Sequence, residues 1–111
     1  MITLGVSDLA ASVAFYRDVV QLELQGQAEG FAFFNAGSVS LVLNAPLGKA
    51  VQPRAGAMEV IFSVPGVRQS YAELMERGSQ FTIPPRVVNG TSWAATFNDP
   101  DGHRLTLLGP E

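Results

Sequence analysis

The sequence contains no cysteine, and it is poor in other residues on which much protein chemistry depends. Without cysteine the chain has no disulfide, no thiolate metal ligand and no cysteine nucleophile. His103 is the single histidine. With neither a second histidine nor a cysteine, we expect no nucleophilic triad. Lys49 is the only lysine, the net charge is −3 and basic residues do not cluster, which argues against a nucleic-acid partner.

Long apolar runs are also missing. No stretch of 18 apolar residues is present, so we expect no membrane-spanning segment and no membrane partner. The first twenty residues carry Asp8, Arg17 and Asp18 where a signal peptide needs an apolar run. The lack of cysteine is compatible with a reducing compartment, and we predict a cytoplasmic protein. With 111 residues and a hydrophobic fraction of 47%, the chain is predicted to form one globular domain, 1–111, with a real core.

Two hairpin signals lie about half a chain apart. In 97–107, Asp99-Pro100 presets a tight turn and Asp101-Gly102 closes it, with alternating residues on either side. A weaker stretch of the same kind covers 34–43. Between them, Asn89-Gly90 is the strongest short hairpin signal of the chain, although Asn89-Gly90-Thr91 also matches a glycosylation triplet.

Apolar periodicity supplies the remaining elements. A helix begins at Leu9 after the N-cap candidates Ser7 and Asp8, and a second helix begins at Val67 with Gly78 as its C-cap. Residues 45–56, with two prolines and two glycines, are predicted to be the linker. Pro84-Pro85 precludes helix between two short extended segments. The expected strands are 2–6, 22–25, 31–34, 39–44, 58–64, 81–83, 86–88, 91–97 and 104–108.

The two halves superimpose as a repeat. Residues 1–6 lie over 59–64, Leu9 lies over Val67, and the end of the first hairpin lies over the end of the last. We therefore predict an α+β fold of two βαβββ modules, about 1–50 and about 51–111. Each helix can cover only one face of its sheet. The other faces must meet each other, meet a partner chain, or enclose a cavity.

Three motifs in order carry a resemblance. Residues 6–18, with Asp8, Phe15, Tyr16 and Asp18, resemble the N-terminal signature of the vicinal oxygen chelate superfamily, and 58–64 and 97–105 resemble its second-half signatures. This superfamily includes glyoxalase I, fosfomycin-resistance enzymes, extradiol dioxygenases and bleomycin-resistance proteins. The resemblance covers essentially the whole chain. It implies curved mixed sheets that enclose a cup with helices on the outer faces, and homodimers in many members.

The same resemblance locates four positions at which metal-dependent members present histidine or glutamate. In this sequence they are Met1, Val42, Glu59 and Thr106, so a single carboxylate remains. Divalent metals of this kind take three or four imidazole or carboxylate ligands together. We therefore predict no metal and no other cofactor.

Alternation along the strands predicts which side chains enter the cup. With Glu59 and Thr106 inward, Arg104 faces inward and His103 faces away. The predicted ligand-binding residues are Glu59, Trp93, Thr96, Arg104 and Thr106. Trp93 is either a pocket wall or part of the packing against the helix, depending on whether a bulge after Asn89-Gly90 reverses it. The other inward residues are Thr3, Ser40, Asn44, Ile61, Ser63, Ser92, Ala94 and Leu108.

Glu59 is the predicted catalytic candidate. An isolated carboxylate in an apolar cup would have a raised pKa and serve as a base near neutral pH, but it could equally pair with Arg104. The first hypothesis is a metal-independent protein that binds an apolar or aromatic small molecule, as bleomycin-resistance proteins do. The alternatives are a lyase, isomerase or dioxygenase-like enzyme with Glu59 as base or partial metal ligand, and a ligand-free dimerisation domain.

Overall fold

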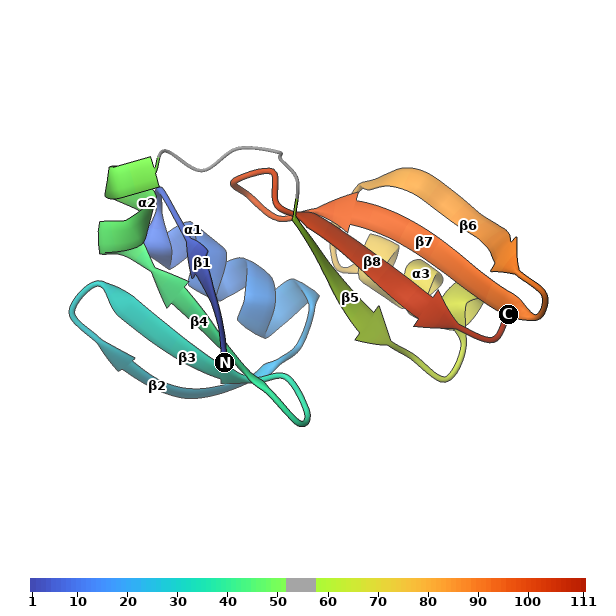
Figure 1. The fold of residues 1–111 in the computed structure, drawn as a ribbon, viewed down its shortest axis with the longest axis horizontal. Helices are drawn as coiled ribbons and strands as arrows, with labels where there is room; N and C mark the ends of the chain where they lie inside the picture. Colours follow the sequence, from blue (N-terminus) through green and yellow to red (C-terminus); the bar gives the residue numbers. More distant parts are fainter. Residues whose placement is uncertain (52–57) are drawn as a thin grey trace. The chain divides into compact units, whose positions relative to one another are not determined.

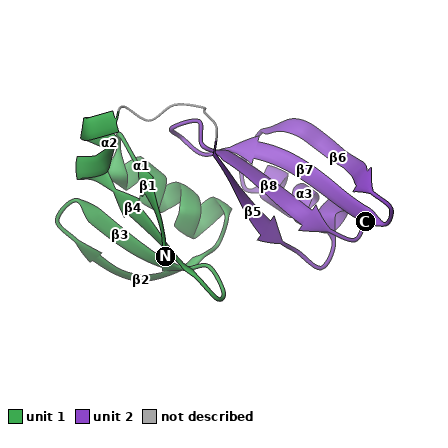
Figure 2. Cartoon of the chain, in the orientation of Figure 1, with its two compact units in different colours: residues 1–54 green, residues 55–111 purple. Residues whose placement is uncertain are grey.

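The computed structural model describes residues 1–51 and 58–111. The chain divides into two compact units, Met1–Arg54 and Ala55–Glu111, and each is described by itself (Figure 2). No helix among the described residues has the length and apolar character needed to cross a membrane.

Both units contain a four-stranded mixed sheet of the same topology (Figure 1). In the first, β1 (Ile2–Gly5) runs parallel to β4 (Ser40–Asn44), followed by β3 (Phe31–Asn35) and the edge strand β2 (Glu23–Ala28), both antiparallel to their neighbours. In the second, β5 (Glu59–Ser63) runs parallel to β8 (Arg104–Gly109), followed by β7 (Ser92–Asn98) and the edge strand β6 (Phe81–Asn89). The predicted α+β fold of two βαβββ modules is confirmed.

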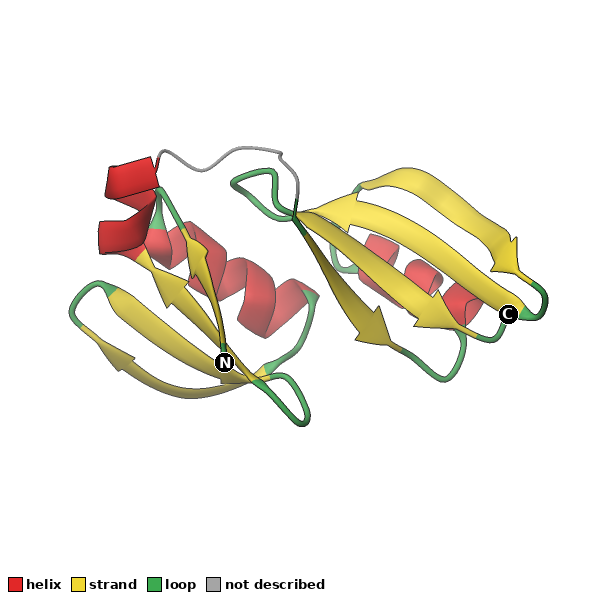
Figure 3. Ribbon diagram, viewed as in Figure 1, coloured by secondary structure: helices red, strands yellow, loops and turns green. Residues whose placement is uncertain are grey.

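Each sheet is covered on one face by the helix that follows its first strand (Figure 3). These helices are α1 (Leu9–Ala14), which continues as a π-helical turn over Phe15–Val19, and α3 (Val67–Glu76). The opposite face of each sheet is called here its open face. The enclosure of a cup by the open faces stays a prediction.

The helix-covered faces hold the two cores. In the first unit, Tyr16 of the π-helical turn and Phe34 of β3 are fully buried with ring centroids 6.1 Å apart. In the second, Tyr71 of α3 contacts Phe81 at 4.7 Å, and Phe81 contacts the buried Phe97 at 4.8 Å. Burial of these rings is the main favourable term that fixes each helix on its sheet.

The first helix starts at one of its two predicted N-caps. The carboxylate of Asp8 accepts a hydrogen bond from the amide of Ala11 at 3.0 Å, as an N-cap does. At the other end, the chain leaves the π-helical turn through Gln21, which has a φ of +65°. The second helix instead leaves through Gly78 at φ +99°, where glycine carries no steric penalty.

The predicted linker 45–56 is wrong in its first part. Residues Ala45–Val51 form the helix α2, and the rest of the predicted segment, 52–56, lies outside the described residues. Asn44 caps this helix, because its side-chain oxygen accepts from the amide of Leu47 at 2.9 Å. Pro46 is tolerated in the first turn, where its missing amide hydrogen has no helical partner. At Gly48 a Cβ would collide with the carbonyl oxygen of Val6, so glycine permits the close packing of α2 on the end of β1.

The strand β6 is longer than predicted. It runs through Pro84-Pro85 as one strand from Phe81 to Asn89. Its pairing with β7 shifts register three times, and each shift adds a residue to β6 and none to β7. The prolines are accepted because β6 is an edge strand and because bulged residues donate no ladder hydrogen bond.

Candidate functional site

The turn between β7 and β8 sets the register of the candidate site. The side-chain oxygen Oδ1 of Asp99 accepts from the amides of Asp101 at 3.0 Å and His103 at 2.8 Å. Gly102 closes the turn at φ +85°, a conformation that favours glycine. His103 belongs to this turn, since its carbonyl oxygen also accepts from the amide of Asp99 at 3.1 Å. The turn therefore fixes the positions of Arg104 and Thr106 on the strand that follows.

Strand pairing then aligns the polar residues in rows across the open face of the second sheet. One row contains Asn98, Arg104 and Glu59, and the next contains Thr96, Thr106 and Ile61. Side chains directly opposite on paired strands project from the same face. The sheet thus brings four of the five predicted site residues together, namely Glu59, Thr96, Arg104 and Thr106.

Hydrogen bonds connect these four side chains into one network. Oε2 of Glu59 accepts from Nε of Arg104 at 2.6 Å and from the hydroxyl of Thr106 at 2.6 Å. The Thr96 and Thr106 hydroxyl oxygens lie 2.9 Å apart. Because Thr106 donates its only hydroxyl hydrogen to Glu59, the Thr96 hydroxyl must be the donor to Thr106. Arg104 and Thr106 thus both donate to one carboxylate oxygen, and Thr96 supports Thr106 from behind.

The network lowers the pKa of Glu59 below its ordinary value, chiefly through the hydrogen bond from Thr106 and then through that from Arg104. The raised pKa expected for an isolated carboxylate is therefore wrong. Desolvation acts in the raising direction but is outweighed, since a third of the Glu59 side chain remains exposed and two donors stabilise its charge. The other prediction for Glu59, pairing with Arg104, is confirmed.

Arg86 belongs to the same face and was missed by the sequence reading. It pairs with Ala94 of β7, one row beyond Thr96, and its Nη1 donates to the Ala94 carbonyl oxygen at 3.4 Å. Its charge also contributes to the lowered pKa of Glu59. Alternation alone could not place Arg86, because the bulges of β6 change the facing of its residues. The only sequence signal for the disturbance was Pro84-Pro85.

Trp93 does not join the network. It lies on the helix-covered face, where the guanidinium carbon of Arg68 in α3 sits 4.6 Å from the centroid of its ring. Of the two alternatives for Trp93, the reversal by a bulge does not occur, because the register shift near Asn89 is taken up by β6 while β7 stays in regular alternation with β8. The prediction that Trp93 shares a ligand surface with Glu59 is therefore corrected in favour of packing against the helix.

The open face of the first sheet has a different chemistry. Val42 occupies the place that Thr106 has in the second sheet, and it is paired with Thr3 and Phe33. Phe31 and Phe33 stack with ring centroids 6.5 Å apart, both half-buried. Of the polar residues predicted to face inward here, Asn44 is engaged as the cap of α2. The aromatic pair could have been found from its i, i+2 spacing on a strand.

The described residues contain no group of three or more His, Cys, Asp or Glu side chains that could hold a metal ion. At the family's ligand positions Met1, Val42 and Thr106 offer no carboxylate or imidazole, and the Thr106 hydroxyl already donates to Glu59. Divalent metals need several such ligands at once. This donor set does not fit a divalent metal.

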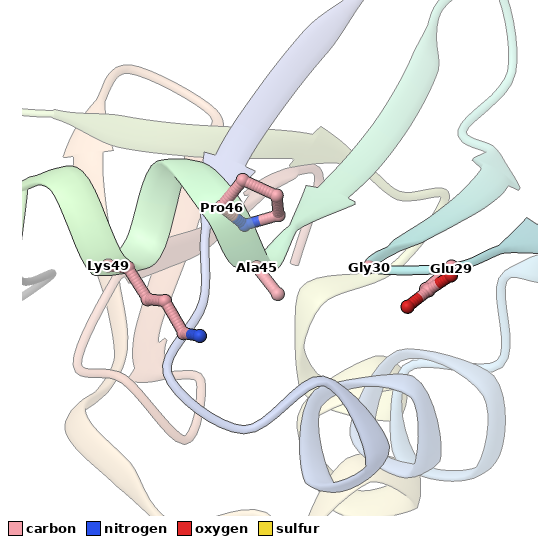
Figure 4. Close-up of a pocket in the computed structure, with 5 residues that line it drawn as sticks. All are labelled: Glu29, Gly30, Ala45, Pro46 and Lys49. Carbon is pink, nitrogen blue, oxygen red and sulfur yellow. The ribbon is translucent and has the colours of Figure 1, made fainter.

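A separate pocket lies in the first unit, between α2 and the turn that joins β2 to β3 (Figure 4). It is lined by Glu29, Gly30, Ala45, Pro46 and Lys49. Gly30 adopts φ +84° and approaches the Pro46 ring closely. The sequence reading did not single out this pocket.

Known proteins resemble the chain in fold and, over shorter stretches, in sequence. A glyoxalase-related enzyme from Fulvimarina pelagi matches with a TM-score of 0.82 and 24% identity over 97% of this chain and 84% of that one. Lactoylglutathione lyase from Agrobacterium tumefaciens matches with a TM-score of 0.80 and 22% identity over 98% of this chain and 92% of that one. At these identities the likeness concerns the fold.

Among curated proteins, Metallothiol transferase FosB from Staphylococcus haemolyticus is 42% identical over 43 residues, which are 39% of this chain and 31% of that protein. The match thus spans less than a third of the length of that relative. The model of the Glyoxalase/Bleomycin resistance protein/Dioxygenase superfamily matches residues 1–107. Together with the two modules and their shared topology, this match shows that the chain belongs to the Glyoxalase/Bleomycin resistance protein/Dioxygenase superfamily.

Proposed function

We propose that the protein is a metal-independent binding protein for a small amphipathic or aromatic molecule, which docks on the open face of the second sheet. The observation that carries this proposal is the network of Glu59, Arg104, Thr106 and Thr96 on that face. Small-molecule sites typically combine apolar surface with a few polar groups held in fixed positions. The network supplies such groups, already oriented before any ligand binds.

Apolar surface lies directly beside the network. Ile61 is paired with Thr106 and is 52% exposed, which is unusual for a large aliphatic side chain in a strand. In the next row, Leu108 is half-buried and continues the apolar surface, while its partner Ala94 is buried. A ligand with an apolar body and one polar group would cover Ile61 and reach the exposed guanidinium group of Arg104.

Metal independence is supported by the chemistry of the donor set. Glu59 Oε2 already accepts two hydrogen bonds, and the other family positions hold Met1, Val42 and Thr106. A network that holds its carboxylate with protein donors has no need of a cation at that oxygen. Because its pKa is lowered, Glu59 is a weaker base than an ordinary glutamate, which favours binding over proton abstraction.

The test uses N-phenyl-1-naphthylamine, an uncharged aromatic probe whose fluorescence rises in apolar surroundings, with protein dialysed against a chelator. We expect saturable binding of one probe molecule per chain. An Ile61→Glu variant should weaken binding about tenfold or more, because the probe would then bury a charge. Val87→Glu is the matched control, since Val87 is 56% exposed on the same sheet but is paired with Trp93 of the helix-covered face. Equal effects of the two variants, or no binding by the unaltered protein, would overturn the proposal.

A metal-dependent enzyme is the second candidate, and the identity to Metallothiol transferase FosB favours it. Elemental analysis of the dialysed protein separates the candidates. Stoichiometric zinc, nickel, iron or manganese would support the enzyme and contradict metal independence. If the protein has turnover, Glu59→Gln should abolish it while preserving probe affinity where Glu59 acts as the base.

The proposal extends to assembly and location. Homodimerisation and a cytoplasmic location, both expected from the sequence, are part of it. Light scattering of the purified protein tests the first, and a mass of one chain at micromolar concentration would contradict it. A third hypothesis, a dimerisation domain without ligand, predicts a dimer that binds no probe.

A further inference from the structure

The second sheet contains few charged residues, and the positive ones outnumber the negative. Its four strands contain three charged residues, Glu59, Arg86 and Arg104, all of which belong to the open face. One positive charge is therefore left over. By contrast, the four strands of the first sheet contain one charged residue, Glu23.

The two arginines lie on either side of the row that contains Thr96 and Thr106. Arg104 lies in the row of Glu59, and Arg86 lies two rows along and two strands across, with the row of Thr96 and Thr106 between them. Rows on one face are about 7 Å apart and strands about 4.8 Å apart, so two long side chains can reach toward the same central row. Thr96 and Thr106 in that row are 1% and 5% exposed.

The guanidinium groups retain most of their donors. Arg104 uses Nε for Glu59, and Arg86 uses Nη1 for a carbonyl oxygen at the long distance of 3.4 Å. Their remaining N–H groups have no other acceptor among the described residues. On the carboxylate, both donors converge on Oε2. Glu59 is thus turned toward its protein partners and orients Arg104, while the donors of both arginines remain available.

We propose that the ligand carries an anionic group, a carboxylate, sulfonate or phosphonate, which Arg86 and Arg104 bind together, and that Glu59 is a positioning residue for Arg104. This inference rests on the proposed function and specifies the charge of its ligand. Planar guanidinium groups match the geometry of such oxyanions, and two of them outweigh the single carboxylate nearby.

A pair of probes tests this. 8-Anilinonaphthalene-1-sulfonate differs from N-phenyl-1-naphthylamine by its sulfonate, so the two report the anionic and apolar contributions separately. We expect the sulfonate probe to bind more tightly and to weaken as salt is raised, because salt screens exposed charges. Arg86→Gln and Arg104→Gln should each weaken the sulfonate probe about tenfold or more and weaken the uncharged probe much less, since that probe carries no anionic group.

Arg68→Gln is the matched control. Arg68 also pairs through Nε with a glutamate, Glu111, at 2.7 Å, but it lies on the opposite face of the sheet beside Trp93. It should change neither probe. Two variants test the positioning role. Glu59→Gln keeps a side-chain oxygen that can accept from Arg104, whereas Glu59→Ala removes this acceptor. Glu59→Gln should therefore lose less affinity for the sulfonate probe than Glu59→Ala.

The outcomes separate the two proposals. If both probes bind equally and the Arg86 and Arg104 variants behave like Arg68→Gln, the anionic ligand is refuted while the binding function stands. If neither probe binds, both are refuted. If Glu59→Ala binds the sulfonate probe more tightly than the unaltered protein, Glu59 repels the anion and the positioning role is refuted.

Discussion

The two sheets of this chain have the same strand order, and the pairings across β1, β4 and β3 match in register those across β5, β8 and β7, yet their open faces differ in chemistry. The correspondence is close, because the amide of Val6 donates to Asn44 at 3.2 Å and the equivalent amide of Val64 donates to Leu108 at 3.0 Å. At equivalent positions, however, the first sheet has Val42 where the second has Thr106, and Phe33 where the second has Thr96. The backbone therefore fixes where a side chain points, and the residue at that place decides what it does.

The helix-covered faces, by contrast, are alike, and the largest expected effects test this likeness. Phe34 and Phe97 are both fully buried in equivalent rows. Phe34→Ala and Phe97→Ala should each lower the free energy of unfolding by about 3–5 kcal/mol, through lost burial and the cavity left behind. Urea denaturation followed by circular dichroism measures this. A loss below about 1 kcal/mol for one variant alone would show that the two cores are not equivalent.

Exchanging the central residues of the open faces should expose their difference. Thr106→Val removes the donor to Glu59 and should lower the free energy of unfolding by about 1–3 kcal/mol, while the pKa of Glu59 rises toward its ordinary value. Val42→Thr places a hydroxyl at a position that is 4% exposed, with a loss of similar size if it finds no partner. Denaturation and a carbon-13 NMR titration of the Glu59 carboxyl check both. An unchanged pKa in Thr106→Val would contradict the network.

The pH dependence of stability should arise from the second sheet. A carboxylate whose pKa is lowered on folding contributes stability above its unfolded pKa, and this contribution is lost as pH falls through the folded pKa. For Glu59 the loss begins below its ordinary value of 4.5. With the side chains of Arg104 and Glu59 46% and 33% exposed, solvent screening limits the contribution to below about 1 kcal/mol.

Glu59→Gln is the variant that isolates this contribution, measured as unfolding at pH 7 and pH 3. The difference from the unaltered protein should shrink at pH 3, because this pH lies below the ordinary pKa of 4.5 and the stability that comes from the lowered pKa declines there. A difference that grows toward low pH would reverse the assigned direction of the pKa shift.

The smallest effects concern the helix ends. Gln21 leaves the first helix at φ +65°, where Gly78 leaves the second at φ +99°. Gln21→Gly should therefore stabilise the protein by about 0.5–1 kcal/mol, and Gly78→Ala should destabilise it by about 1 kcal/mol. Thermal unfolding of the two variants measures both changes in stability. Destabilisation by Gln21→Gly would mean that the Gln21 side chain contributes more than the backbone strain costs.

The sequence was sufficient for the fold and for most of the candidate site. Hydrophobic alternation and the Asp99-to-Gly102 turn placed Glu59, Thr96, Arg104 and Thr106 on one face, and the rows of the second sheet agree. These predictions succeeded because β5, β7 and β8 pair in regular alternation. The repeat supplied the rest, since equivalent segments in the two halves predicted equivalent strands.

The failures have local physical causes. Arg86 was missed because three bulges break alternation along β6. The helix α2 was interpreted as linker because the prolines and glycines of 45–56 outweighed the local cap at Asn44, and because its contact at Gly48 depends on tertiary structure. The pKa of Glu59 was expected to rise because two donors from β8, 45 and 47 residues away along the chain, are invisible until the strands are paired.

The bulged strand β6 has a consequence for solubility. It is one of the two outer strands of its sheet, and it carries the exposed valines Val87 and Val88, which would favour association with other chains. Two prolines without amide hydrogens and three breaks in register leave it without the regular row of donors that a new strand would need. The strand that presents Arg86 to the open face is thereby also a barrier to aggregation through the sheet edge.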